Sequence, residues 1–203
     1  MKFFARLIHL RGYRPVPISP ATALVLAELS EAGFSGVGVA LGAASCEITV
    51  VHRGNQISGG RLARGGRWID EQFALSNRMY RRDSQGAQVL DVEGARLRKE
   101  ALSLNSPADD DSRLVADLYR NLVAELVEVF SETLVSNLQV ALLPQPLPIV
   151  CGGGPARIEG FGKLFRAEID RQPLPAAVKG PDLVNDHEYA VARGCLIRAE
   201  LEE

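Results

Sequence analysis

The sequence predicts a mixed α/β fold. Its 203 residues are 46% hydrophobic and 24% charged, which is enough apolar material to bury a core as one domain or as two small lobes. A valine- and isoleucine-rich stretch at residues 36–63 indicates strands, and an apolar stripe along residues 112–140 indicates a long helix. Helical and strand patterns alternate along the rest of the chain, as is typical of α/β proteins.

Two helices are expected before the first strand. Apolar residues recur at helical spacing over residues 2–10 and roughly over residues 20–32. Ser19 is a suitable cap for the second helix, and Pro20 suits its first position because that position needs no backbone N–H. Both helices therefore precede the change to strand periodicity at residue 36.

Residues 36–63 are expected to form a strand, a turn of small residues and two further strands. Polar and apolar residues alternate across Cys46–Val50, as they do in a half-buried strand. The sequence Arg-Gly-Asn at residues 53–55 supplies the turn between the last two strands. Gly65 and Gly66 end this strand region.

The middle of the chain is expected to be helical. Residues 67–80 and 92–104 have helical patterns, and the polar residues 81–88 between them are interpreted as a loop. The sequence NSPADDD at residues 105–111 is interpreted as a solvated internal linker.

The second half begins with the longest predicted element, a helix over residues 112–140 that Ser112 is expected to cap. Leu114, Leu118, Leu122 and Leu126 lie on one face of this helix. The elements expected after it are a strand at 147–151, a helix at 158–170, a short strand at 176–178 and a helix at 186–201.

Charge and hydropathy disfavour several classes of partner. The formal net charge is -2, and Lys and Arg are scattered, so neither nucleic acid nor anionic lipid is an expected partner. No apolar run approaches the roughly 18 residues that a membrane span needs. Arg6, His9 and Arg11 interrupt the N-terminal apolar run before it reaches the length of a signal peptide. A cytoplasmic location is expected.

Cysteines and histidines indicate neither a metal site nor a nucleophile. Cys46, Cys151 and Cys195 are odd in number, widely spaced and without a C-x-x-C pattern. The three histidines are isolated from one another. We therefore predict structural cysteines, no metal ligand and no catalytic residue.

The sequence PIVCGGGPARIEGF places three glycines, residues 152–154, between an apolar strand and a predicted helix. Such a turn lets a phosphate or a polar ring edge approach backbone N–H groups, although a tight turn without ligand fits this stretch equally well. Neither standard phosphate motif applies. Gly162-Lys163 is followed by leucine, and the glycines of residues 36–42 have one residue too many and run into a strand.

A second turn of small residues, Gly-Ala-Ala-Ser at 42–45, joins two predicted strands and can form an anion-binding concavity. This turn and three other stretches resemble motifs of the actin-like ATPase superfamily, which includes actin, heat-shock chaperones, sugar kinases, MreB and ParM. Residues 40–46 resemble its second phosphate loop, 62–73 its Gly-Gly-x-x-x-Asp helix entry, 152–160 its adenosine loop, and 188–197 its closing helix.

The resemblance covers nearly the whole chain but only the second nucleotide-binding lobe of that family. It implies an actin-like (ribonuclease H-like) lobe, with a mixed sheet flanked by helices and a small inserted subdomain. The implied divisions are linking helices at 1–34, the lobe at 35–66 and 105–203, and an inserted helical subdomain at 67–104.

The resemblance also implies a nucleotide site, with departures from the family pattern. The family's first phosphate loop would lie upstream of Met1. Its metal-orienting aspartate is Ala40 here, its ribose-binding glutamate falls on Ala95 and its lysine on Arg98. The implied nucleotide-binding residues are Gly42, Ala43, Ala44, Ser45, Gly65, Gly66, Arg98, Gly152, Gly153, Gly154 and Arg157.

The missing acids favour binding over hydrolysis, because phosphoryl transfer depends on positioning and on metal-assisted charge stabilisation. We expect weak binding of ATP or ADP, no ATP hydrolysis by this chain alone, and a role in self-association or partner binding, and the missing acids make a magnesium ion doubtful. Asp70 and Glu71 are interpreted as cap or dipole partners of a helix. The alternatives are a subunit of a chaperone- or sugar-kinase-type ATPase whose other lobe is supplied elsewhere, and a scaffold lobe that binds no nucleotide.

Overall fold

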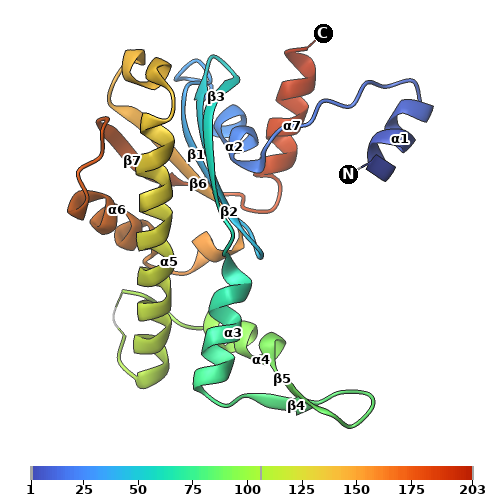
Figure 1. Ribbon diagram of the computed structural model, residues 1–203, viewed down its shortest axis with the longest axis vertical. Coiled ribbons are helices and arrows are strands. Elements are labelled where there is room, and N and C mark those ends of the chain that lie inside the picture. The colour runs from blue at the N-terminus through green and yellow to red at the C-terminus, as the bar shows by residue number, and fades with distance from the viewer. Residues whose placement is uncertain (1, 106, 203) are drawn as a thin grey trace.

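The central sheet has five strands in the order β3-β2-β1-β6-β7 (Figure 1). The structure is a computed structural model that describes residues 2–105 and 107–202. β1, β2 and β3 are antiparallel neighbours, whereas β6 runs parallel to both β1 and β7. The strands are β1 (Gly36–Leu41), β2 (Cys46–His52), β3 (Asn55–Leu62), β6 (Leu147–Gly152) and β7 (Val178–Leu183). This sheet confirms the predicted mixed α/β class.

The predicted turn between β2 and β3 is confirmed. Arg53 and Gly54 have φ angles of 50° and 77°, and two successive positive φ angles are typical of the tight turns that match the twist of a hairpin. Since this geometry depends on local sequence, the turn could be recognised without knowledge of the sheet.

Helices cover both faces of the sheet (Figure 1). On one face lie α5 (Asp110–Val135) and α6 (Phe161–Arg171), which enclose the larger hydrophobic core together with β1, β2 and β6. On the other face, α2 (Pro20–Glu28) and α7 (Ala190–Glu200) pack together over a smaller core that includes Leu24, Val150 and Ala190. The result is a three-layer arrangement with helices outside and the sheet in the middle.

Two glycines allow α2 to lie very close to its neighbours. A Cβ atom on Gly38 of β1 would lie 1.9 Å from the carbonyl oxygen of Ala21, and one on Gly194 of α7 would lie 1.9 Å from the carbonyl oxygen of Ala23. Any larger residue would force the helix away, so these glycines are packing residues.

A small subdomain extends from the lower end of the molecule in Figure 1. It contains α3 (Gly66–Ser76), β4 (Tyr80–Arg82), β5 (Gln88–Leu90) and α4 (Val92–Glu100). The interpretation of residues 81–88 as a loop was wrong in part, because β4 and β5 form an antiparallel hairpin. Asp83 stabilises its turn by accepting hydrogen bonds from the backbone N–H groups of Gln85 and Ala87, both at 2.9 Å. Strands of three residues are too short to show a periodic pattern.

The long helix α5 begins two residues earlier than predicted and ends five residues earlier. Its cap is Asp109, whose Oδ1 accepts a hydrogen bond from the N–H of Ser112 at 2.7 Å, so Ser112 is not the cap. A 3₁₀ helix, η1 (Leu138–Leu142), occupies the end of the predicted span. The segment that was interpreted as a linker, residues 105–111, therefore supplies the N-cap of α5.

The remaining helix lies apart from the sheet. α1 (Lys2–Leu10) is joined to α2 by an extended segment (Figure 1). Its Leu7, Ile8 and Leu10 side chains are exposed. None of the described helices combines the length and the apolar character needed to cross a membrane.

Candidate functional site

A cleft of about 570 Å³ lies between the carboxyl ends of β1 and β6 and the small subdomain. Ligands of α/β proteins commonly bind beyond the carboxyl ends of parallel strands, and β1 and β6 are parallel. The lining residues are Leu41, Gly42, Ala43, Gly66, Arg67, Asp70, Arg96, Lys99, Glu100, Tyr119, Gly154, Pro155, Arg157 and Ile158.

The two glycine turns recognised in the sequence meet at this cleft. Gly42 and Ala43 line it from the β1–β2 turn, and Gly154 lines it from the turn after β6. These residues are more than 100 positions apart in the chain, and the parallel pairing of β1 with β6 brings them together.

The three glycines after β6 have three different environments. Gly152 packs against Leu24, and a Cβ atom at this position would lie 3.0 Å from the leucine side chain. Gly153 has a φ angle of 110°, and a Cβ there would lie 2.1 Å from the carbonyl oxygen of Leu41. Around Gly154 the space is open, because no atom outside Gly154 and its two chain neighbours lies within 4 Å of the position that a Cβ would take. Of the three glycines, only Gly154 thus has open space where a side chain would stand.

The β1–β2 turn is fixed by the start of α3. The N–H groups of Gly66 and Arg67 donate hydrogen bonds of 2.9 Å to the carbonyl oxygens of Gly42 and Ala43. Gly65 lies directly beneath the turn, where a Cβ would be 2.3 Å from the Gly42 oxygen. The carbonyl oxygens of the turn therefore satisfy the first N–H groups of α3, and these hydrogen bonds hold the turn at the edge of the cleft.

Several predicted site residues lie outside the main cleft. Ser45, Gly152 and Gly153 line a second cavity of about 330 Å³, which also contacts Gly154. Ser45 accepts a hydrogen bond on Oγ from Arg61 at 3.0 Å. Gly65 and Ala44 are absent from the lining of both cavities.

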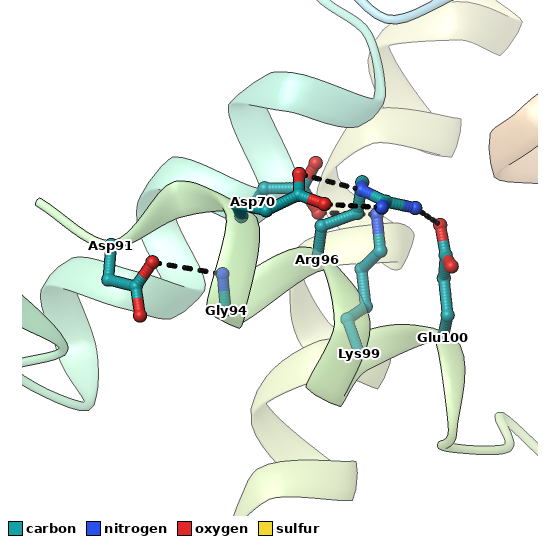
Figure 2. A network of polar contacts seen from close by, with 7 residues as sticks. Asp70, Asp91, Gly94, Arg96, Lys99 and Glu100 are labelled. Atoms are coloured by element: carbon teal, nitrogen blue, oxygen red, sulfur yellow. Dashed lines mark hydrogen bonds and ion pairs between the residues drawn. The ribbon is translucent and has the colours of Figure 1, made fainter.

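Arg98 of α4 also lies outside the cleft. Its guanidinium group pairs with Asp111 and lies over the ring of Phe73, 5.9 Å from the ring centroid. The residues of α4 that line the cleft are Arg96, Lys99 and Glu100, which share one face of the helix (Figure 2). Their i, i+3, i+4 spacing indicates in the sequence that the three residues share a face of the helix. It does not indicate that this face of α4 lines the cleft.

A buried ion pair joins α3 to α4 at the cleft (Figure 2). Nζ of Lys99 lies 2.6 Å from Oδ1 of Asp70, and the two residues are only 5% and 6% exposed. Burial raises the pKa of Asp70 above its usual value, while the contact with Lys99 acts in the opposite direction. Asp70 is therefore not a cap or dipole partner as predicted, because it lies beyond the first turn of α3 and its side chain pairs with Lys99 of α4.

Tyr119 of α5 lines the same part of the cleft and is almost completely buried. Burial, followed by the nearby Asp70 carboxylate, raises the pKa of its hydroxyl group. Its phenol is therefore neutral at ordinary pH, and it can serve the cleft only as a packing surface and a hydrogen-bonding group.

The side chains that line the cleft do not suit magnesium, which is the metal that the resemblance to actin-like ATPases implies. Mg²⁺ prefers carboxylate oxygens and water. Only Asp70 and Glu100 bring carboxylates to the lining, and they are paired with Lys99 and Arg96. Within residues 2–105 and 107–202, no three His, Cys, Asp or Glu side chains lie close enough to hold an ion.

Comparisons with known proteins identify the fold. A family model described as Volactin matches residues 1–199 of this chain. No protein among the curated sequences matches this chain.

Solved structures match over most of the chain at low sequence identity. MreB5 of Spiroplasma citri bound to ADP has a TM-score of 0.69 at 14% identity, covering 99% of this chain and 65% of that one. The same protein bound to AMPPNP has a TM-score of 0.67 at 12% identity, covering 99% and 66%. The ethanolamine utilization protein EutJ from Carboxydothermus hydrogenoformans has a TM-score of 0.60 at 17% identity, covering 89% and 54%. This chain thus spans roughly half to two thirds of those proteins, and the predicted actin-like lobe is confirmed as its fold.

Proposed function

Because this chain belongs to the Volactin family and has the fold of an actin-like lobe, we propose that it binds an adenine nucleotide in the cleft beside β1 and β6. Its role is then in assembly or partner binding rather than in ATP hydrolysis. The observation that carries this proposal is the meeting of both glycine turns at one cleft, where Gly154 leaves its backbone open to a ligand.

Further support comes from the shape of the site and from its structural neighbours. The cleft volume of about 570 Å³ lies within the range of small-molecule sites. MreB5 of Spiroplasma citri, whose fold this lobe shares, has been solved with ADP and with AMPPNP. The exposed turn at Gly42 and Ala43 is then the phosphate side of the site, and the turn at Gly154 is the adenosine side.

Nucleotide binding should appear as thermal stabilisation of the purified chain. A ligand that binds only the folded state stabilises it, and each kcal/mol raises the melting temperature of a chain this size by about 2–4 °C. We expect such a rise with millimolar ADP or ATP, and a smaller one with adenosine. The absence of any shift with all three ligands would favour the non-binding scaffold.

ATP hydrolysis should stay at background, with or without magnesium. Ala40 near the end of β1 can neither accept a hydrogen bond with its side chain nor orient metal-bound water, and both carboxylates that line the cleft are paired with cations. Phosphate release from ATP measures this directly. Steady turnover that disappears when residues 42–45 are substituted would contradict the prediction.

The alternative is an ATPase subunit of chaperone or sugar-kinase type whose other lobe comes from another chain. It is favoured by the partial coverage of the structural neighbours and by the exposed apolar residues Leu7 and Leu10 of α1. Light scattering after size exclusion, together with phosphate release from ATP, would separate the two. Self-association that depends on nucleotide supports assembly, whereas a monomer that gains ATPase activity with a partner lobe supports the alternative.

A further inference from the structure

Three arginines from three different elements surround the cleft. Arg67 comes from the first turn of α3, Arg96 from α4, and Arg157 from the 3₁₀ helix η2 (Gly154–Arg157). Their side chains are 39–70% exposed, so each is accessible to a ligand in the cleft. Neither Arg67 nor Arg96 is among the nucleotide-binding residues that the sequence resemblance implied, although Arg67 lies within the Gly-Gly-x-x-x-Asp stretch.

Each arginine has an acidic neighbour that a ligand can replace. Exposed ion pairs contribute only about 0–1 kcal/mol, so exchanging a carboxylate for a phosphate costs little. The pairs are Arg67 with Glu71 at 2.8 Å, Arg96 with Glu100 at 2.8 Å and Arg157 with Glu188 at 3.7 Å.

The carboxylates of the cleft are less available than its guanidinium groups. A divalent ion bound to Asp70 would lie close to the Lys99 ammonium group, and displacing Lys99 would leave a cation without a partner at 5% exposure. Glu100 is held by Arg96. A metal ion therefore meets one buried, neutralised acid and one exposed acid, Glu100, whereas an anion meets three exposed guanidinium groups.

We propose that this cleft binds the phosphate groups of a nucleotide without a divalent metal, with Arg67, Arg96 and Arg157 supplying the positive charge. This inference rests on the proposed function. Guanidinium groups present paired N–H donors that match phosphate oxygens, and they remain charged at every physiological pH. Arg96 lies on the face of α4 that lines the cleft, where Glu93 and Glu100 both contact it.

Titration calorimetry with ADP, in excess magnesium and in excess EDTA, tests the metal directly. The expected result is the same affinity in both buffers. Arg96→Gln should weaken ADP binding by about 10- to 100-fold, as expected for the loss of charged hydrogen bonds. Adenosine binding should not change, since adenosine has no phosphate.

Arg98→Gln is the matched control, because Arg98 lies on the same helix and is also ion-paired but does not line the cleft. It should leave ADP affinity unchanged. ADP binding that requires magnesium, or equal losses in Arg96→Gln and Arg98→Gln, would overturn the inference while leaving nucleotide binding intact. Failure of ADP, ATP and adenosine to bind in either buffer would overturn the proposed function itself.

Discussion

Replacing Lys99 with methionine should lower the free energy of unfolding by about 3–5 kcal/mol at neutral pH, because it leaves a buried carboxylate without its partner. Asp70 and Lys99 are both more than nine-tenths buried, and their contact joins α3 to α4. Urea unfolding, followed by circular dichroism, measures the change. Arg98→Met is a suitable control, since it removes a cation from an exposed site on the same helix.

The loss in Lys99→Met should depend on pH in a defined direction. Burial already raises the pKa of Asp70, and removing Lys99 removes the main opposing influence, so the folded-state pKa rises further. A carboxyl group with a raised folded-state pKa binds more protons in the native state than in the unfolded state. Stability then falls as the pH rises through that pKa. The loss in free energy of unfolding caused by Lys99→Met should therefore be largest above the folded-state pKa of Asp70. It should shrink as the pH falls toward the usual pKa of aspartate.

A second substitution provides the control for this mechanism. Asp70→Leu combined with Lys99→Met removes both charges and should recover much of the stability that Lys99→Met loses, because no buried charge remains. A deficit that is the same at every pH, or a double variant no more stable than Lys99→Met, would show that packing rather than charge explains the loss.

Gly153→Val should destabilise the chain by about 2–5 kcal/mol, combining backbone strain with overpacking. Gly153 has a φ angle of 110°, and a Cβ would lie 2.1 Å from the carbonyl oxygen of Leu41. The same substitution at Gly154 meets open space. Gly154→Val should therefore cost much less stability, while its side chain occupies the cleft and weakens ADP binding.

The two variants separate the structural role of the triple glycine from its proposed ligand role. Urea unfolding gives the stability of each, and the thermal shift with ADP gives the binding. If Gly153→Val unfolds at the same urea concentration as the wild type, the close contact with Leu41 is not important for stability. If Gly154→Val binds ADP as well as the wild type does, the open face of this turn is not part of the nucleotide site.

The candidate site was only partly visible in the sequence. The turns at Gly42 and Gly154 could be found because a run of small residues after a strand is a local signal, and both turns line the cleft. Arg98 was the arginine selected on α4, yet Arg96 faces the cleft. Successive residues of a helix point about 100° apart, so an error of one or two positions selects a different face.

The sequence by itself determined the elements whose patterns are local and long. The hairpin turn at Arg53 and Gly54 and the apolar stripe of α5 follow from neighbouring residues, and both are confirmed. The tertiary structure alone decided which groups meet across the fold. Asp70 and Lys99 are 29 positions apart and neutralise each other only because α3 packs against α4. At Gly153 a Cβ would meet the end of β1, whereas the next residue, Gly154, faces open space. Periodicity carries no information about such contacts, because they depend on the distance between elements rather than on the order of residues within one.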